Sequence, residues 1–150
     1  MAAEKPTTFS TATPNWISVI LSWPPTWFLA RLALASAYLL GGVVKLFDFP
    51  GAVAEQAHFG LQPAALWAVV VIIVEIAGAL LLILGRFVWL AAGMLGALTA
   101  VATLVANNFW ALQGHERFMA TNSFFEHLGL IAGLAMAAMI ADRRASRDAT

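Results

Sequence analysis

A small set of polar side chains in apolar surroundings could do chemistry in this chain: Lys45, Glu75, Asn107, Asn108, Glu126 and His127. Glu75 stands at the middle of an apolar run from Ala64 to Leu84, where an ionised carboxylate needs a cation, a polar partner or a water-filled cavity. The other five fall toward the same ends of three further apolar stretches. Together they predict a ligand-binding or buried polar cluster, whose polar floor and aromatic walls suit a quinone head group.

Simpler explanations exist for the same residues. A structural interaction of Glu75 with Lys45 or Asn107 would fix the helix register without binding a ligand. Glu126 near a helix start is stabilised by the helix dipole, and His127 points about 100° away from it, where it could face lipid headgroups. Lys45 and Arg31 lie near opposite ends of one apolar stretch and could snorkel toward water.

Metal and thiol chemistry are not indicated. The chain contains no Cys, which excludes disulfides, thiolate metal ligands and dithiol redox chemistry of its own. His58, His115 and His127 show neither HxxxH nor HExxH spacing, so no metal site is expected. The formal net charge is zero and gives no reason to expect a nucleic-acid partner. No cofactor is evident, and quinone is the one small molecule we consider.

The elements that position these residues are predicted to be membrane helices. Hydrophobic residues make up 61% of the chain and charged residues 11%, against about 25% charged in soluble domains. Lipid must therefore cover much of the surface. We predict an all-α membrane protein, a four-transmembrane-helix bundle over residues 26–141, with helices at about 26–47, 64–84, 87–110 and 122–141.

The remaining segments are predicted to lie outside the bilayer. Residues 1–15 read as a flexible tail and residues 142–150 as a cytoplasmic tail. Residues 16–25 are aromatic-rich and end in two prolines, which favours an amino-terminal interfacial segment. Residues 48–63 form a loop with a short interfacial helix around 52–58, Gly85 and Arg86 form a hairpin turn, and Asn122 or Ser123 caps the fourth helix.

Glycines predict where the helices approach one another closely. Small residues at helical spacing let backbones pack tightly within a membrane. The expected helix-packing positions are Gly42, Gly78, Gly96, Gly129 and Gly133.

The distribution of basic residues predicts the orientation. Four spans place both termini and the Gly85 turn on one side, together with Lys5, Arg86, Arg143, Arg144 and Arg147. The opposite side holds only Lys45 and Arg117. The positive-inside rule then places both termini in the cytoplasm, in an inner (plasma) membrane.

Several of these motifs, in this order, resemble the DoxX family of small four-helix membrane proteins. The matching residues are Arg31, Gly41, Lys45, Phe47, Phe49, Gly60, Pro63, Glu75, Gly78, Gly85, Arg86, Asn122, Phe124 and Glu126. The resemblance covers about Trp27 to Ala141 and implies an inner-membrane bundle. It also implies a link to membrane redox work, since the related DoxD branch includes a thiosulfate:quinone oxidoreductase subunit and other members join a complex with detoxifying enzymes.

Two functional hypotheses follow. The first is an accessory or quinone-binding subunit of a membrane redox system, which we prefer to a stand-alone enzyme because the chain lacks Cys and a nucleotide motif. The alternative is a structural or assembly subunit of a larger membrane complex, docking through its glycine stripes and aromatic amino-terminal segment. The expected partners are the lipid bilayer and either membrane proteins or further copies of the chain.

Overall fold

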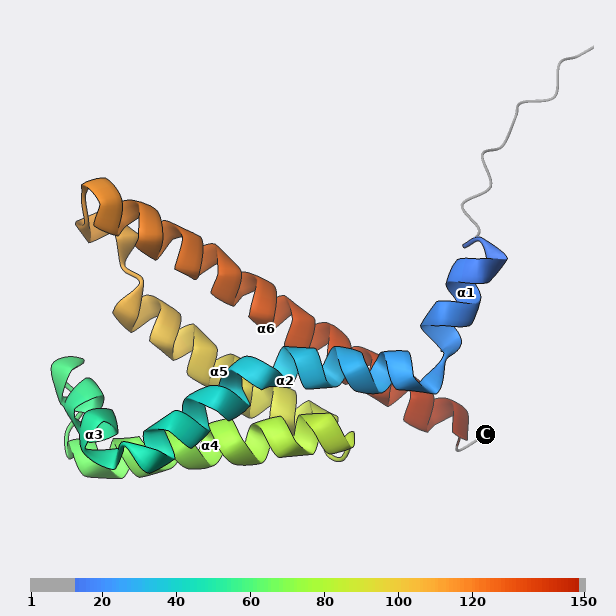
Figure 1. The fold of residues 1–150 in the computed structure, drawn as a ribbon, viewed down its shortest axis with the longest axis horizontal. Coiled ribbons are helices and arrows are strands. Elements are labelled where there is room, and N and C mark those ends of the chain that lie inside the picture. Colours follow the sequence, from blue (N-terminus) through green and yellow to red (C-terminus); the bar gives the residue numbers. More distant parts are fainter. Residues whose placement is uncertain (1–12, 149–150) are drawn as a thin grey trace, which may run out of the picture.

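The computed structural model describes residues 13–148, and they form helices joined by short connections (Figure 1). In chain order these are α1 (Asn15–Ser22), α2 (Pro24–Phe47), α3 (Phe49–His58), α4 (Ala64–Leu84), α5 (Val88–Ala106), the 3-10 turn η1 (Phe109–Ala111) and α6 (Gly114–Asp148). Four helical segments, at α2, α4, α5 with η1, and α6, are long and apolar enough to cross a membrane. The predicted all-α fold with four spans is confirmed.

The turn after α4 makes α4 and α5 a hairpin. Gly85 adopts a positive φ of 71°, and its N–H donates to the Leu82 carbonyl at 3.2 Å. The N–H of Arg86 donates to the Leu81 carbonyl at 3.1 Å, which completes a Schellman motif. The left-handed conformation is open to glycine without a Cβ clash, so the helix stops here and the chain reverses.

The amino-terminal helix α1 stands apart from the bundle. Figure 1 shows it projecting at a steep angle from the start of α2. None of its residues is buried, and Trp16 and Trp23 are 67% and 57% exposed. Pro24 and Pro25 begin the next helix, and the Thr26 hydroxyl donates to the Ile20 carbonyl at 2.7 Å across the bend. Exposed tryptophans on a short helix that turns away from a membrane span suit the headgroup level.

The spanning helices form two pairs that meet at one end. α2 packs on α4 and α5 packs on α6, while α4 also contacts α5. In Figure 1 the pairs lie close together near the termini and diverge toward α3. The main buried cluster lies at the closed end and contains Ala35, Tyr38, Ala79, Leu82, Val88, Ala91, Ala92, Leu95, Leu134 and Ala137. A smaller cluster of Ala52, Ala68 and Ile72 joins α3 to α4.

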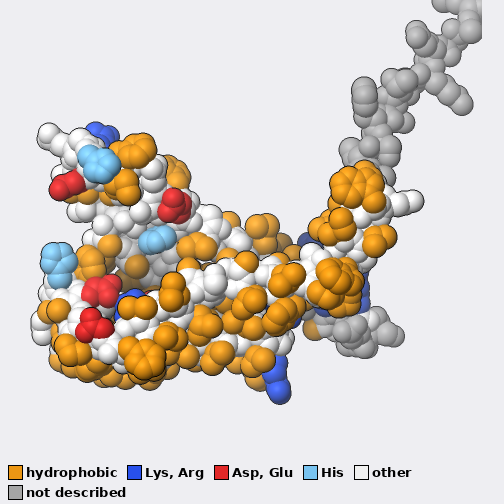
Figure 2. Space-filling model, in the orientation of Figure 1, with side chains coloured by type: hydrophobic (Ala, Val, Ile, Leu, Met, Phe, Trp, Pro, Cys, Tyr) orange, Lys and Arg blue, Asp and Glu red, His pale blue; other side chains and the backbone are white. Residues whose placement is uncertain are grey.

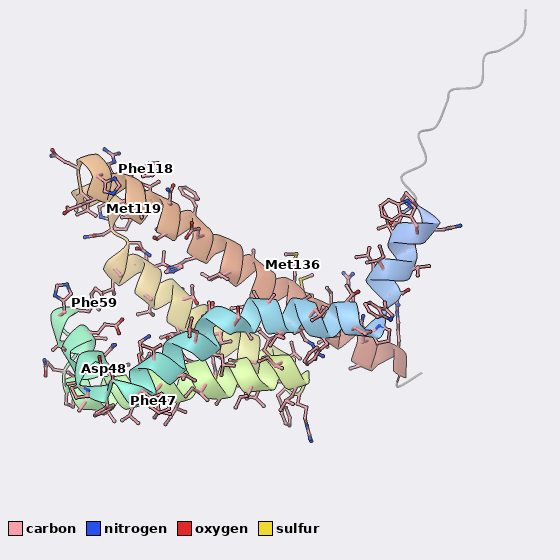
Figure 3. The ribbon with its side chains drawn as sticks, in the orientation of Figure 1. Phe47, Asp48, Phe59, Phe118, Met119 and Met136 are labelled. Carbon is pink, nitrogen blue, oxygen red and sulfur yellow. The ribbon has the colours of Figure 1, made fainter. Side chains whose placement is uncertain are left out.

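The outer surface matches a lipid environment. Figure 2 shows apolar side chains along the length of the helices, with charged side chains gathered toward the two ends. Three of the side chains labelled in Figure 3 point outward: Phe47, Phe118 and Met136 are 87%, 60% and 57% exposed. Asp48 is the N-cap of α3, and its carboxylate accepts from the Gly51 N–H at 3.0 Å. Bilayer contact accounts for this apolar exposure.

Several helix boundaries differ from the sequence-based prediction. The fourth span, expected at 122–141, runs as α6 from Gly114 to Asp148, so Asn122 and Ser123 lie inside the helix and cap nothing. The third span, expected at 87–110, agrees in extent with α5 and η1 together, Val88–Ala111, although its regular α-helix ends at Ala106. Hydropathy indicates only the part of a helix that lies in lipid. The helix itself extends beyond the lipid wherever its backbone hydrogen bonds continue. Of the predicted tails, residues 1–12 and 149–150 lie outside the described residues, while Asn15 and residues 142–148 are helical.

Candidate functional site

A cavity of about 830 Å³ lies between the two helix pairs on the side where they diverge. Figure 2 shows the hollow between the α3 end of the molecule and the start of α6. Its lining comes from five helices, α2 to α6, and from the connections beside them. The polar and ionisable residues of the lining are Tyr38, Lys45, Glu55, Gln56, Glu75, Thr99, Asn107, Ser123 and His127. The rest of the wall is apolar.

An ion pair occupies the wall made by α2 and α4. The Lys45 ammonium lies 3.0 Å and 3.3 Å from the two Glu75 carboxylate oxygens. The side chains are 19% and 11% exposed, so they are largely shielded but open to the cavity. This ion pair gives the Glu75 carboxylate the cationic partner that a charged group within a membrane span requires.

Glycines in α2 make this ion pair possible. A Cβ on Gly42 would lie 2.7 Å from Cγ1 of Ile76, and one on Gly41 would lie 3.4 Å from a Glu75 oxygen. Any side chain at Gly42 would therefore push α2 away from α4. The close approach of the two backbones lets Lys45, near the end of α2, reach a carboxylate in the middle of α4.

The wall made by α5 and α6 carries a hydrogen-bonded histidine. The His127 Nδ1 lies 2.8 Å from the Thr103 hydroxyl and 3.2 Å from the side-chain amide of Asn107. The Thr103 hydroxyl donates its one proton to the Thr99 carbonyl at 2.6 Å. With that proton directed to Thr99, we assign Nδ1 of His127 as the donor to Thr103. The amide nitrogen of Asn107 lies 3.2 Å from Nδ1, and the amide fits this network once it is flipped so that its oxygen accepts from Nδ1, an orientation that hydrogen bonding alone assigns.

This network fixes the chemistry that His127 offers to the cavity. With its proton on Nδ1, the neutral imidazole has an unprotonated Nε2. Nε2 is then a hydrogen-bond acceptor and a base. The ring becomes a donor at Nε2 only when it is protonated.

A third polar contact ties α2 to α5 across the closed side of the cavity. The Thr99 hydroxyl donates to the Leu95 carbonyl at 2.7 Å, so the Tyr38 hydroxyl donates to Thr99, also at 2.7 Å. Both side chains are buried. Sequence reasoning left Thr99 and Thr103 out of the site, although Thr99, Thr103 and Asn107 recur at a spacing of four, which puts them on one helix face.

Two residues of the predicted cluster lie away from the cavity. Glu126 is exposed, and neither Glu126 nor Asn108 contributes to the lining. The orientation of α6 explains the first case, because His127, Leu130 and Leu134 face α5 or the cavity and Glu126 is turned about 100° away from His127. Asn108 lies beyond the end of α5, where the chain has left the helix.

The predicted packing glycines divide into two groups. A Cβ on Gly78 would lie 2.8 Å from Leu95, and one on Gly133 would lie 3.2 Å from Leu34, so these positions resemble Gly42 in allowing close contact. At Gly96 and Gly129 no described atom lies within 4 Å of such a Cβ. These two glycines face away from the packed interior of the chain.

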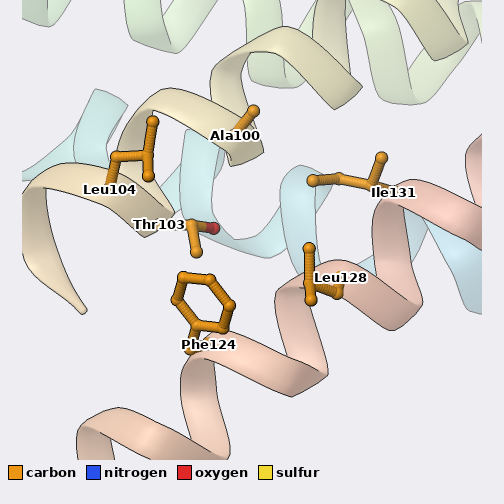
Figure 4. Close-up of a pocket in the computed structure, with 6 residues that line it drawn as sticks. All are labelled: Ala100, Thr103, Leu104, Phe124, Leu128 and Ile131. Atoms are coloured by element: carbon orange, nitrogen blue, oxygen red, sulfur yellow. The ribbon is translucent and has the colours of Figure 1, made fainter. Parts of the chain in front are cut away.

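A smaller apolar cavity of about 150 Å³ lies between α5 and α6 (Figure 4). Its lining is Ala100, Thr103, Leu104, Phe124, Leu128 and Ile131. Phe124 also packs edge-on against Phe109 and Phe125, with ring centroids 5.3 Å and 5.6 Å apart. Thr103 lines this smaller cavity and His127 lines the larger one, so their hydrogen bond links the walls of the two cavities.

The fold and this site define a class, a four-helix integral membrane protein with a polar-walled cavity between two helix pairs. A family model described as DoxX matches residues 26–108, and the chain belongs to the DoxX family. It is similar to the inner membrane protein YphA of Escherichia coli strain K12, with 25% identity over 91 residues. That alignment covers 61% of this chain and 65% of YphA, slightly less than two thirds of that relative. No solved structure matches the chain.

Proposed function

We propose that this DoxX protein is an accessory subunit of a membrane redox system that holds a quinone head group in the large cavity. The observation that carries the proposal is the presence of two polar groups on facing walls of one cavity, Lys45 with Glu75 on one wall and His127 with Asn107 on the other. A volume of about 830 Å³ lies within the range of small-molecule sites, roughly 300–1,000 Å³.

The two walls offer complementary hydrogen bonds to a reduced head group. A hydroquinone carries two oxygens at opposite ends of a flat apolar ring. The Lys45 ammonium donates to one oxygen, and the unprotonated Nε2 of His127 accepts the proton of the other hydroxyl. The apolar lining, which includes Trp67 and Val71, packs against the ring.

The accessory role rests on what this chain brings to a redox reaction. It contains no Cys, so no dithiol of its own can take electrons from a bound quinol. Its groups bind and orient the head group and accept one proton at His127, and the second proton leaves to water through the open side of the cavity. In this proposal the electrons pass to a partner protein.

The proposed setting is an inner membrane with both termini in the cytoplasm. The similarity to the inner membrane protein YphA supports the membrane. The excess of Arg on the side of the Gly85 turn supports the orientation. The cavity then opens toward the exterior face.

Photolabelling with an azido-benzoquinone tests the proposal on the full chain in lipid nanodiscs. We expect peptides from α4, α5 and α6 that line the cavity to carry the label, and excess unlabelled short-chain quinone to remove it. The chain offers matched controls: His127→Ala and Asn107→Ala should reduce labelling severalfold, whereas the neighbouring Glu126→Ala and Asn108→Ala should not. Equal labelling of all four variants would overturn the proposal.

The second candidate function is a structural or assembly subunit. The observation that favours it is the open space beside Gly93, Gly96 and Gly129, where a neighbouring helix could approach the backbone of α5 and α6. Extraction in a mild detergent tests it, since this function predicts partner proteins in fixed stoichiometry. Gly96→Leu should then release those partners, whereas Ala65→Leu, at an exposed position of α4 on the other helix pair, should not.

A further inference from the structure

Two arginines share one tryptophan at the closed end of the bundle, far from the cavity mouth. The guanidinium carbons of Arg31 and Arg144 lie 5.5 Å and 4.8 Å from the centre of the Trp27 ring. Trp27 is fixed, because it packs against the main buried cluster. The start of α2 and the end of α6 thus bring two cations to the same aromatic side chain.

Neither arginine has a carboxylate partner in the part of the chain that the structure describes. There the ion pair joins Lys45 to Glu75, on the other side of the molecule. The Nε of Arg31 is buried and has no hydrogen-bond partner among the described residues. Two like charges and one buried donor without a described partner therefore converge at Trp27.

The position of Arg31 is set by the backbone. Its guanidinium occupies the space where a Cβ on Gly85 would stand. The glycine that ends α4 therefore also makes room for the cation. Arg31 is thereby held between α2 and the α4–α5 turn, with Arg144 of α6 on the same tryptophan.

We propose that Trp27, Arg31 and Arg144 form a binding site for the phosphate of an anionic lipid headgroup. A guanidinium presents a planar fork of N–H donors that matches phosphate oxygens. The site lies near the ends of three spanning segments and beside α1, whose exposed tryptophans mark the headgroup level. Basic pockets between membrane helices bind anionic lipids in this way. Free phosphate shares the chemistry, and the experiment separates the two sources.

Native mass spectrometry of the detergent-solubilised full chain, titrated with phosphatidylglycerol or phosphatidylcholine, tests the site. We expect the protein to retain phosphatidylglycerol in preference to phosphatidylcholine. Arg144→Gln should weaken phosphatidylglycerol binding about fivefold, as expected for one basic residue at a membrane surface. Arg143→Gln is the matched control, an exposed arginine next in sequence, and should leave binding unchanged.

Further variants guard against a folding effect. Arg31→Lys keeps the charge but loses the planar fork and should weaken lipid binding while circular dichroism stays unchanged. Equal loss in Arg143→Gln and Arg144→Gln would overturn the site in favour of diffuse surface charge. Displacement of the lipid by millimolar inorganic phosphate would overturn the lipid as occupant. None of these results bears on quinone labelling of the distant cavity, so the two proposals fail independently.

Discussion

Removing either member of the Lys45–Glu75 pair should lower the free energy of unfolding more than removing both. The perturbations are Lys45→Met, which keeps the chain length of the aliphatic stem, and Glu75→Gln, which keeps the shape of the carboxylate. At 3.0 Å and an effective dielectric constant of about 20, the charges attract by about 5 kcal/mol. Desolvation of both groups cancels part of this, and the residual exposure of 19% and 11% weakens it further.

The result expected from the double-mutant cycle follows from the balance between this attraction and the desolvation of the two groups. Each single variant leaves one uncompensated charge within the span, and we expect each to lower the free energy of unfolding by about 2–3 kcal/mol. The double variant leaves two neutral groups in the same space and should lose only about 1–2 kcal/mol. The coupling energy should therefore be about 3 kcal/mol.

The assay is unfolding by sodium dodecyl sulfate in mixed micelles, followed by tryptophan fluorescence and circular dichroism. Glu126→Gln provides a control, because this carboxylate is exposed and outside the cavity, and it should leave the unfolding curve unchanged. Reversal of the pair, Lys45→Glu with Glu75→Lys, should recover part of the loss of either reversal alone. Additive losses in the cycle would show that the two groups do not stabilise each other.

Three further predictions concern packing, the buried hydroxyl pair and orientation. Gly42→Ala should destabilise the protein by about 1–3 kcal/mol in the same unfolding assay, because its Cβ would meet Ile76 at 2.7 Å, whereas Gly93→Ala has open space and should not; equal effects would contradict the close contact. Tyr38→Phe should cost about 1 kcal/mol, since it removes the hydrogen bond to Thr99; an unchanged curve would show that the bond contributes nothing. A carboxy-terminal alkaline phosphatase fusion should be inactive and a fluorescent-protein fusion bright, and the reverse result would place the termini outside.

The membrane spans could be predicted because their signal is local. The apolar run of α4 predicts its bounds, 64–84, and the structure has Ala64–Leu84. A run of that length matches the bilayer whatever its neighbours do. The polar turns at both ends of α6 carry no such signal, because they form a helix in water and their hydropathy resembles that of a loop.

The candidate site was predictable only where the spacing fixed the geometry. Glu75 is so unusual within its apolar run that a partner was required, and Lys45 was among the few groups at a suitable depth. The sequence did not determine whether Glu126 or His127 faces the cavity. Neighbouring side chains on a helix point about 100° apart, and the packing of α6 on α5 determines the rotation of α6 about its axis. Glu55 and Gln56 reach the cavity from α3, and no periodicity links that helix to the others.

The proposed binding of a quinone head group in the cavity is tested most directly by native mass spectrometry. The chain is extracted from its own membrane with its small molecules retained. We expect a quinone bound to the wild-type chain and to Glu126→Gln. The quinone should be absent from His127→Ala and from the Lys45→Met/Glu75→Gln double variant. A wild-type chain that carries lipid but no quinone, from a membrane that contains quinone, would contradict it.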